Sequence, residues 1–524
     1  MSPSLPKIDS VPSLSVSDMT STAHETPPVT STSLLSKSSL VDRAAADISA
    51  AAIASRNDEN ARWYYYLTPN AVKSLPQYQY DGEDQSLLYK YILSPLAAWC
   101  VDNLTPAWLA PNAITLLGLC LMVFSYLLIW YWCPGTYEAN TDLDIATSSY
   151  SVPAVIFLLN GCAMLIYQTL DNMDGKQARK TGSSSPLGLL FDHGCDALNS
   201  LLGSANWIAA MAMVPGNVSD LLGNNDHDNI QSKSLLSEFF GGDVVIACVL
   251  ILFPMVAFYT TTWEQYYTGK LVLPPFNGPS EGLFMGAALS IISFVWGPMF
   301  WQGTSVADGA IDKLESYMDE GDTILSFFTP MQGRVRNMDL IVLASFIGLT
   351  REVAQKIIFV VRTHGLQTLR TAVPNFLLVA STLAMVHFDP TLLLRRPRVM
   401  MHLISGLFTE QTGQLMLDHM VQEDFEIFKR WTLFPYVFLA AGMMMGWSFS
   451  VVALDAFFFV YTTMLWIYLA FKIRVVIYEI CDVLSIYCFD IVTPHPKKLS
   501  EVGGEVISGT TVPAVVDGTV KKTN

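Results

Sequence analysis

The sequence predicts an all-α membrane protein, a polytopic bundle of about ten transmembrane helices. Hydrophobic residues make up 51% of the 524 residues and charged residues only 15%, a composition typical of chains that cross a bilayer several times. Stretches of about 20 mainly apolar residues, the length needed to cross a hydrocarbon core of about 30 Å, recur from residue 113 to residue 475. These repeated stretches define the expected architecture.

The N-terminal region precedes the first apolar span. Residues 1–60 are rich in Ser, Thr, Pro and Ala and predict a disordered cytoplasmic tail. Residues 84–110 carry an amphipathic pattern that includes Leu87, Tyr91 and Trp99, which predicts a helix lying at the membrane interface. Ordinary packing of such a helix against the bundle explains the same pattern equally well.

The transmembrane helices are expected where the apolar stretches lie. They are predicted at 113–132, 152–170, 188–214, 243–262, 281–301, 338–361, 371–388, 399–420, 432–452 and 455–475.

The positive charges in the short loops predict the orientation. Loop 134–150 has no Lys or Arg, whereas loop 172–187 has Lys176, Arg179 and Lys180, so the second loop is expected in the cytoplasm. Alternation of the spans then places both termini in the cytoplasm. It also places Asn217, which begins an Asn-Val-Ser glycosylation motif, on the lumenal side.

Charge and cysteine usage exclude several classes of protein. The net charge of −16, from 46 acidic and 30 basic residues, argues against nucleic acid as a partner, because a phosphate backbone selects basic surfaces. The eight cysteines include no C-x-x-C pair and predict neither a disulfide framework nor a zinc site.

Four aspartates border one short predicted cytoplasmic loop. Asp171 and Asp174 are three residues apart near the end of the second span, and Asp192 and Asp196 are four apart near the start of the third. On a helix each pair projects from one face, so two adjacent helices can bring all four together.

Carboxylates gathered at a membrane edge require a positive counter-charge. Oxygen ligands without a thiolate suit Mg²⁺ or Mn²⁺ better than Zn²⁺, and Mg²⁺ commonly shares its coordination sphere with substrate phosphates. The aspartates therefore predict a divalent metal and a diphosphate substrate. Gly175 and Ala178 are small where a nucleotide would approach the helix, although helix packing explains either residue alone equally well, and Arg179 offers a cation to phosphate.

The spacing of these residues resembles the signature of the CDP-alcohol phosphotransferase superfamily, D-x2-D-G-x2-A-R-x8-G-x3-D-x3-D, from Asp171 to Asp196. Further stretches are similar to the eukaryotic choline/ethanolamine phosphotransferase branch, and together the similarity covers about residues 60–490. These stretches are 111–115, 183–188, 191–196, 262–269 and 277–282.

The resemblance implies the CDP-alcohol phosphotransferase fold and a homodimeric enzyme of the endoplasmic reticulum or Golgi membrane, active on the cytoplasmic side. Such an enzyme transfers phosphocholine or phosphoethanolamine from CDP-choline or CDP-ethanolamine to diacylglycerol and releases CMP. The resemblance places two Mg²⁺ or Mn²⁺ ions on the motif aspartates. It implies contacts near the nucleotide for Asn112, Gly175, Ala178, Arg179 and Gly188.

The domain organisation follows from this resemblance and the spans. Residues 111–301 are expected to form the catalytic helices, 302–337 a lumenal loop and 338–490 the C-terminal transmembrane helices. Residues 491–524 are expected to form a second disordered cytoplasmic tail.

A base must accept the proton of the acceptor hydroxyl. His193 lies about 100° around the helix from Asp192, so it can face a lipid acceptor while the aspartates hold metal. Asp196 is the other candidate for the base. In the alternative interpretation, His193 only orients a metal ligand from behind. Glu264 and Glu281 flank a loop rich in aromatic residues and are candidate headgroup or acceptor contacts.

Two other functional classes are weighed against this interpretation. One is a related enzyme with inositol or serine as the acceptor, and the other is a transporter or scaffold without turnover. The sequence does not distinguish choline from ethanolamine.

Overall fold

The computed structural model describes residues 64–132, 152–213, 234–318, 326, 328–427 and 431–495. All the elements below belong to one compact unit, Tyr65–Asn524. The described residues are almost entirely helical, with one short parallel strand pair between β1 (Gly82–Asp84) and β2 (Leu271–Leu273). The predicted all-α class is confirmed.

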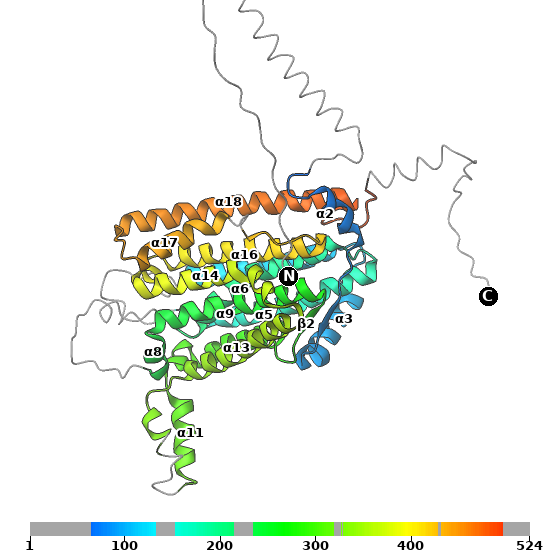
Figure 1. Ribbon diagram of the computed structural model, residues 1–524. Coiled ribbons are helices and arrows are strands. Elements are labelled where there is room, and N and C mark those ends of the chain that lie inside the picture. The colour runs from blue at the N-terminus through cyan, green and yellow to red at the C-terminus, as the bar shows by residue number, and fades with distance from the viewer. Residues whose placement is uncertain are drawn as a thin grey trace, which may run out of the picture. The chain divides into compact units, whose positions relative to one another are not determined.

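A helix lies at each predicted span within the described residues, and several of these helices run alongside one another (Figure 1). They are α4 (Pro111–Trp132), α5 (Ala154–Thr181), α6 (Pro186–Ala210), α9 (Asp243–Thr268), α10 (Leu283–Trp296), α13 (Asn337–His364), α14 (Leu369–Phe388), α16 (Pro397–Val421), α17 (Phe434–Met444) and α18 (Val451–Leu484).

Six helical segments in the described part are long and apolar enough to cross a membrane: α4, α5, α9, Gly278–Trp296 (which includes α10), Leu366–Phe388 (which includes α14) and α18. Three others, α6, α13 and α16, have 25 to 28 residues but are more polar. In α16, for example, Arg398, Glu410 and Asp418 are buried. The chain is a polytopic helical membrane protein in which polar helices lie among apolar ones.

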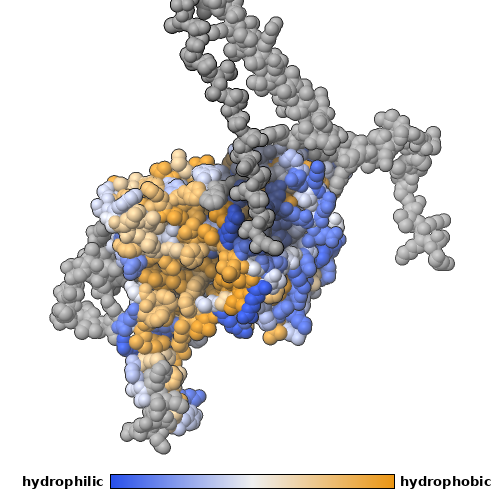
Figure 2. Space-filling view, in the orientation of Figure 1, coloured by the Kyte–Doolittle hydropathy of each residue, from blue (hydrophilic) through white to orange (hydrophobic). Residues whose placement is uncertain are grey.

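Apolar side chains cover a broad surface over α14, α17 and α18, and hydrophilic side chains gather at the end of the molecule where α2 (Pro69–Ser74) and α3 (Ser94–Asn103) lie (Figure 2). An apolar band of this kind is expected where lipid chains contact a protein.

The last two spans differ from the prediction in their bounds. α17 ends at Met444, and Gly446 follows with a left-handed φ of 79°, a conformation that favours glycine and breaks a helix. α18 begins at Val451, where the Ser450 side chain caps it, and continues to Leu484, past the predicted end at residue 475.

Two segments outside the spans also differ from the prediction: one helix is shorter than expected, and one expected loop contains a helix. The predicted helix 84–110 is helical only over 87–103, and Pro106, which lacks an N–H donor, lies in the irregular stretch that follows. The predicted loop 302–337 contains helix α11 (Ser305–Glu315). The predicted tail 1–60, residues 496–524 of the predicted tail 491–524, and the Asn217 motif lie outside the described residues.

A buried hydrogen-bond network ties together the helices that carry the site. Asn160 of α5 accepts from Ser125 of α4 (2.7 Å) and from Asn206 of α6 (2.7 Å), and it donates to Ser290 of α10 (2.8 Å). Because buried amides are costly unless they are hydrogen-bonded, this network specifies how the four helices pack. α5 is therefore held between α4 and α10, with α6 alongside.

Candidate metal and phosphotransfer site

A tight connection brings the end of α5 next to the start of α6. Gly182 ends α5 with a left-handed φ of 68°, which glycine adopts without strain. Ser185 then caps α6 by accepting from the Gly188 N–H at 3.2 Å, and Pro186 occupies the first turn, where its missing N–H costs nothing. The two aspartate pairs of the motif thus lie on neighbouring helix ends.

Three of the four predicted metal ligands gather into an acidic cluster, which we define as Asp171, Asp192 and Asp196. One oxygen atom from each of these carboxylates lies within 4.8 Å of the other two. Asp171 comes from α5, and the other two come from successive turns of α6. The carboxylates that the sequence spacing places on one face of each helix therefore do lie together where α5 and α6 meet.

Asp174 lies beside this cluster and is held separately. Its Oδ2 accepts from the Thr115 hydroxyl of α4 at 2.5 Å, and its Oδ1 accepts from the Gly175 N–H at 2.5 Å. These two donors stabilise the ionised carboxylate and orient it from the α4 side. Sequence reasoning missed Thr115, which precedes Asp174 by 59 residues.

Tyr167 links the two helices of the acidic cluster. Its hydroxyl lies 3.4 Å from Asp171 Oδ1 and also donates to Asp196, and the side chain is buried. Tyr167 precedes Asp171 by one helical turn, so a search for polar groups four residues from a ligand would have found it.

The residues present fit a hard divalent cation. Asp192 Oδ1 is buried and has no hydrogen-bond partner, and three carboxylates at this separation repel one another unless a positive charge lies between them. An all-oxygen ligand set is the one that Mg²⁺ and Mn²⁺ prefer. The cluster is therefore a candidate metal centre.

His193 lies between the acidic cluster and α9. Its ring packs against Phe258 of α9 with ring centroids 6.0 Å apart, and the side chain is buried. Its Nδ1 makes no hydrogen bond and lies 3.7 Å from Asp192 Oδ2. His193 thus borders the cluster from the side of α9.

The predicted nucleotide contacts lie around the same connection. Asn112 of α4 is buried and donates to the Cys488 carbonyl at 3.0 Å, and a Cβ on Gly188 would lie 3.6 Å from its Oδ1. Gly175 lies next to the Arg179 guanidinium: a Cβ at residue 175 would lie 3.5 Å from the nearest guanidinium nitrogen. Ala178 is partly exposed and Arg179 is exposed, so this face is open to a ligand.

The two glutamates proposed for the headgroup already have protein partners. Glu264 pairs with Lys356 Nζ at 2.5 Å. Glu281 accepts from the Ser86 hydroxyl at 2.5 Å and from the Asn277 N–H at 3.0 Å. Neither belongs to the acidic cluster. Tyr80, which sequence reasoning missed, lies closer to the acidic cluster than either glutamate does. Partial burial raises the pKa of the Tyr80 hydroxyl, and the nearby Asp192 carboxylate raises this pKa further.

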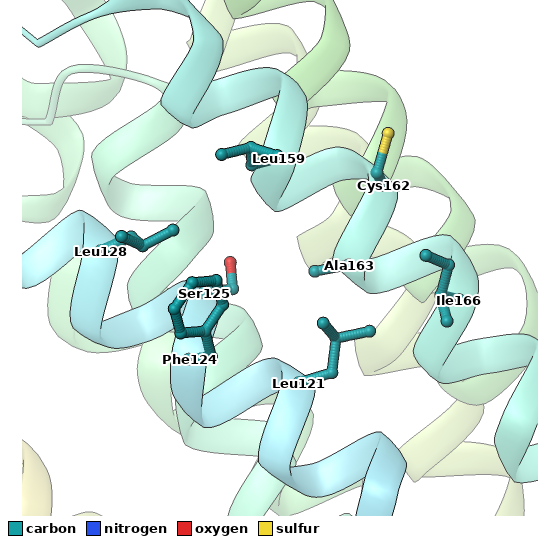
Figure 3. A pocket seen from close by; sticks show the side chains of 8 residues that line it. All are labelled: Leu121, Phe124, Ser125, Leu128, Leu159, Cys162, Ala163 and Ile166. Carbon is teal, nitrogen blue, oxygen red and sulfur yellow. The ribbon is translucent and has the colours of Figure 1, made fainter.

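A separate cavity of about 120 Å³ lies between α4 and α5 (Figure 3). Its walls are apolar apart from Ser125, and Leu121 and Ile166 lie at the end nearer the aspartates. Ile166 precedes Asp171 by five residues, about 7.5 Å along the helix. The cavity offers no ligand for a cation or a phosphate, so it is not the site of chemistry. Its lining is Leu121, Phe124, Ser125, Leu128, Leu159, Cys162, Ala163 and Ile166.

The comparisons with known proteins converge on this region. Residues 108–219 match the family model of CDP-alcohol phosphatidyltransferases, a segment that includes the acidic cluster. The chain is 29% identical over 439 residues to choline/ethanolaminephosphotransferase 2 of Arabidopsis thaliana, covering 81% of this chain and 98% of that protein.

Two further relatives align over shorter stretches. Choline/ethanolaminephosphotransferase 1 of Arabidopsis thaliana is 35% identical over 236 residues, 45% of this chain and 50% of that protein. A CDP-diacylglycerol–serine O-phosphatidyltransferase of Encephalitozoon cuniculi is 33% identical over 231 residues, 44% of this chain and 49% of that protein.

Proposed function

We propose, on the premise that this chain belongs to the CDP-alcohol phosphatidyltransferase family, that it transfers phosphocholine and/or phosphoethanolamine from CDP-choline or CDP-ethanolamine to diacylglycerol. The products are phosphatidylcholine or phosphatidylethanolamine, and CMP. The chain is a membrane phosphotransferase, and the proposal concerns which donor and acceptor it uses.

The observation that carries the proposal is the convergence of Asp171, Asp192 and Asp196 within 4.8 Å inside the matched segment 108–219. Relatives named choline/ethanolaminephosphotransferase match the chain over 45% and 81% of its length. A cluster of acids at the end of two membrane helices suits a donor whose diphosphate arrives with divalent cations.

Asp171, Asp174, Asp192 and Asp196 would hold two Mg²⁺ or Mn²⁺ ions, with Asp174 on the α4 side. The ions, when bound, supply the positive charge that neutralises the diphosphate and the departing CMP. Thr115 and Tyr167 orient the carboxylates, which supports a defined ligand geometry rather than a solvated acidic surface.

The nucleotide would lie on the open face at the α5–α6 connection. Arg179 is exposed there and offers a planar cation to phosphate oxygens. Gly175, Ala178 and Gly188 leave room for the nucleotide to approach the backbone, and the Asn112 side chain lies beside Gly188. CDP binding therefore depends on side chains that differ from those facing the acceptor.

His193 would accept the proton from the diacylglycerol hydroxyl as that oxygen attacks the β-phosphorus. Its Nδ1 makes no hydrogen bond, and the ring lies against α9, so it is free to face an acceptor on that side. Asp196 is the alternative base. Its contact with the Tyr167 hydroxyl favours the ionised form and a metal-binding role.

The enzyme would act as a homodimer in the endoplasmic reticulum or Golgi membrane, with the α5–α6 connection on the cytoplasmic side. Lys176, Arg179 and Lys180 near this connection support that orientation.

A second function is favoured by one relative, the serine enzyme of Encephalitozoon cuniculi. That protein is named as a CDP-diacylglycerol–serine O-phosphatidyltransferase, so its donor carries the lipid and its acceptor is serine. The acceptor side of this chain, where His193 packs on Phe258, is apolar and supports a lipid acceptor.

The test is a reconstituted assay of the purified chain. Diacylglycerol would be supplied with labelled CDP-choline or CDP-ethanolamine, and a parallel reaction would contain CDP-diacylglycerol with labelled serine. We expect phospholipid and CMP only with diacylglycerol as the acceptor, loss of product in EDTA, and recovery with Mg²⁺ or Mn²⁺. Product only in the serine reaction would establish the second function instead.

A further inference from the structure

The segment that follows α18 forms a defined turn. Ser485 ends the helix with a left-handed φ of 53°, a conformation that lets the chain change direction at a helix end. Further along, the Asp490 side chain accepts from the backbone N–H groups of Val492 (2.8 Å) and Thr493 (3.0 Å). We call residues 485–490 the C-terminal strap.

The C-terminal strap is attached to the residues proposed to contact the nucleotide. The Asn112 amide of α4 donates to the Cys488 carbonyl at 3.0 Å and lies 3.6 Å from the Cys488 thiol. A Cβ on Gly188 would lie 3.6 Å from Oδ1 of the same amide. The strap therefore borders the face proposed for CDP, although it lies outside residues 108–219, which match the family model.

Phe489 of the strap places an aromatic ring beside the helix that carries two of the clustered aspartates. Its ring packs edge-on against the Phe191 ring of α6, with centroids 5.6 Å apart, and Phe191 immediately precedes Asp192. Phe489 nevertheless remains 50% exposed. The end of α18 that carries the strap lies beside α2 (Figure 1), at the hydrophilic end of the molecule. Water contact with an aromatic ring is unfavourable, so a flat ligand that covers the ring would be stabilised.

The donor substrate contains one flat aromatic group, the cytosine ring. Its diphosphate is proposed to lie at the acidic cluster and Arg179, and the ribose joins the base to this diphosphate. The base is therefore expected near the cluster as well, where Phe191 and Phe489 lie. Every base has a π face on which an aromatic side chain can stack, and such stacking contributes strongly to nucleotide binding.

We propose that Phe489 stacks on the cytosine ring of the bound CDP-alcohol, with the strap held in place by the hydrogen bond between Asn112 and Cys488. The inference rests on the proposed function and adds a nucleotide contact from outside the aspartate motif. Because the contact is made to the base, it is the same for CDP-choline, CDP-ethanolamine and CMP.

The binding test separates stacking from apolar packing. Phe489→Leu keeps an apolar side chain against Phe191 but removes the aromatic ring, whereas Phe489→Trp keeps a ring. We expect the Kd for CMP, measured with Mn²⁺ by equilibrium dialysis in detergent, to rise about tenfold in Phe489→Leu, equivalent to about 1.4 kcal/mol. Phe489→Trp should bind CMP within about twofold of the native chain.

Phe449→Leu is the matched control. Phe449 is also an exposed ring in an edge-on pair, with the Trp447 centroid 6.3 Å away, and it precedes the opposite end of α18. We expect this variant to bind CMP as the native chain does. A thermal melt in detergent shows whether Phe489→Leu is folded, and Phe489→Met takes its place if it is not.

Three results would overturn the assignment. An unchanged Kd for CMP in the folded Phe489→Leu variant would show that the ring only packs on Phe191 or contacts lipid headgroups. An equal rise in Phe489→Leu and Phe489→Trp would show that an aromatic ring is not what binds. Weaker binding of CDP-choline with unchanged binding of CMP would assign the ring to the alkylammonium headgroup, which also binds aromatic faces.

CMP binding keeps this inference separate from the proposed function, because it requires no acceptor. If the native chain makes no phospholipid from diacylglycerol but Phe489→Leu weakens CMP binding, the proposed function fails and the stacking contact stands. If the native chain makes phospholipid and CMP binding is the same in Phe489→Leu, the proposed function stands and the stacking contact fails. We expect phospholipid synthesis in the native chain, together with a weaker affinity for CMP and a KM for diacylglycerol within about twofold of native in Phe489→Leu.

Discussion

Lys356 of α13 forms a buried ion pair with Glu264 of α9, with Nζ 2.5 Å from Oε2. Lys356 also donates to the Val272 carbonyl of β2 at 2.8 Å. The pair thus joins two membrane helices to the strand pair. Glu264, which the sequence predicts as a candidate headgroup contact, therefore already has a cationic partner in the protein.

Replacing Lys356 by Met should leave the Glu264 carboxylate buried without its counter-charge. Removing one partner of a buried pair costs about 3–5 kcal/mol, so we expect a clearly lower melting temperature in detergent. The double variant Lys356→Met/Glu264→Gln should recover most of the loss. A native-like melting temperature for the single variant would show that the pair contributes little.

Replacing Asp192 by Asn should abolish turnover. Asn keeps the shape but removes the charge of a carboxylate whose Oδ1 is buried without a hydrogen-bond partner, so affinity for a divalent cation falls. Mn²⁺ binding, followed by electron paramagnetic resonance, should weaken in parallel. Asp312→Asn, at an exposed position on α11, is the matched control. Retained turnover in Asp192→Asn would eliminate the proposed metal centre.

Replacing Tyr167 by Phe tests the role of its hydroxyl without emptying the core. The hydroxyl contacts Asp171 and Asp196, and groups that orient metal ligands in this way are typically worth 10- to 100-fold in metal affinity or activity, so we expect a loss of about that size. Titration of activity with Mn²⁺ should show a higher metal requirement. The same metal requirement as the native enzyme would indicate that Tyr167 serves only in packing.

Replacing His193 by Ala should lower turnover by about 10²- to 10⁴-fold, the usual contribution of a general base. Binding of a labelled CDP-alcohol should persist, because the proposed nucleotide contacts lie at the α5–α6 connection. Equilibrium binding and turnover are measured on the same preparation. Loss of binding together with turnover would mark His193 as a structural residue.

Glu479 near the end of α18 anchors the start of the described chain. Its carboxylate accepts from the backbone N–H groups of Tyr65 (2.5 Å), Tyr66 (3.0 Å) and Leu67 (3.1 Å). Glu479→Ala leaves these donors without their partner, at a cost of about 1–3 kcal/mol. We expect faster limited proteolysis near residue 65, with Glu423→Ala, a partner of Thr68, as a milder comparison. Equal cleavage rates in Glu479→Ala and the native chain would contradict the anchor.

Much of the site was predictable from local spacing. Asp192 and Asp196 project from one helix face because four residues make about one turn, and the short Gly182–Ser185 connection requires α5 and α6 to be neighbours. The helical class and the approximate positions of the spans follow from composition, because a bilayer demands long apolar helices.

Contacts between distant parts of the chain were not predictable in this way. Thr115 reaches Asp174 across 59 residues, and Lys356 reaches Glu264 across 92. Such pairs depend on which helices pack together and on their rotation, and a single sequence does not specify either. For the same reason the sequence places four aspartates in one group, whereas the structure gathers three and holds Asp174 from α4.

The sequence by itself determined the membrane-helix class, the acidic motif and its oxygen-rich chemistry, because these depend on residue type and on distances along one helix. Only the tertiary structure decided that Tyr167 bridges the acidic cluster, that Glu264 is paired with Lys356, and that Phe258 packs between His193 and Phe408. Those relationships arise where α5, α6, α9, α13 and α16 meet, and helix packing brings together side chains that are far apart in the chain.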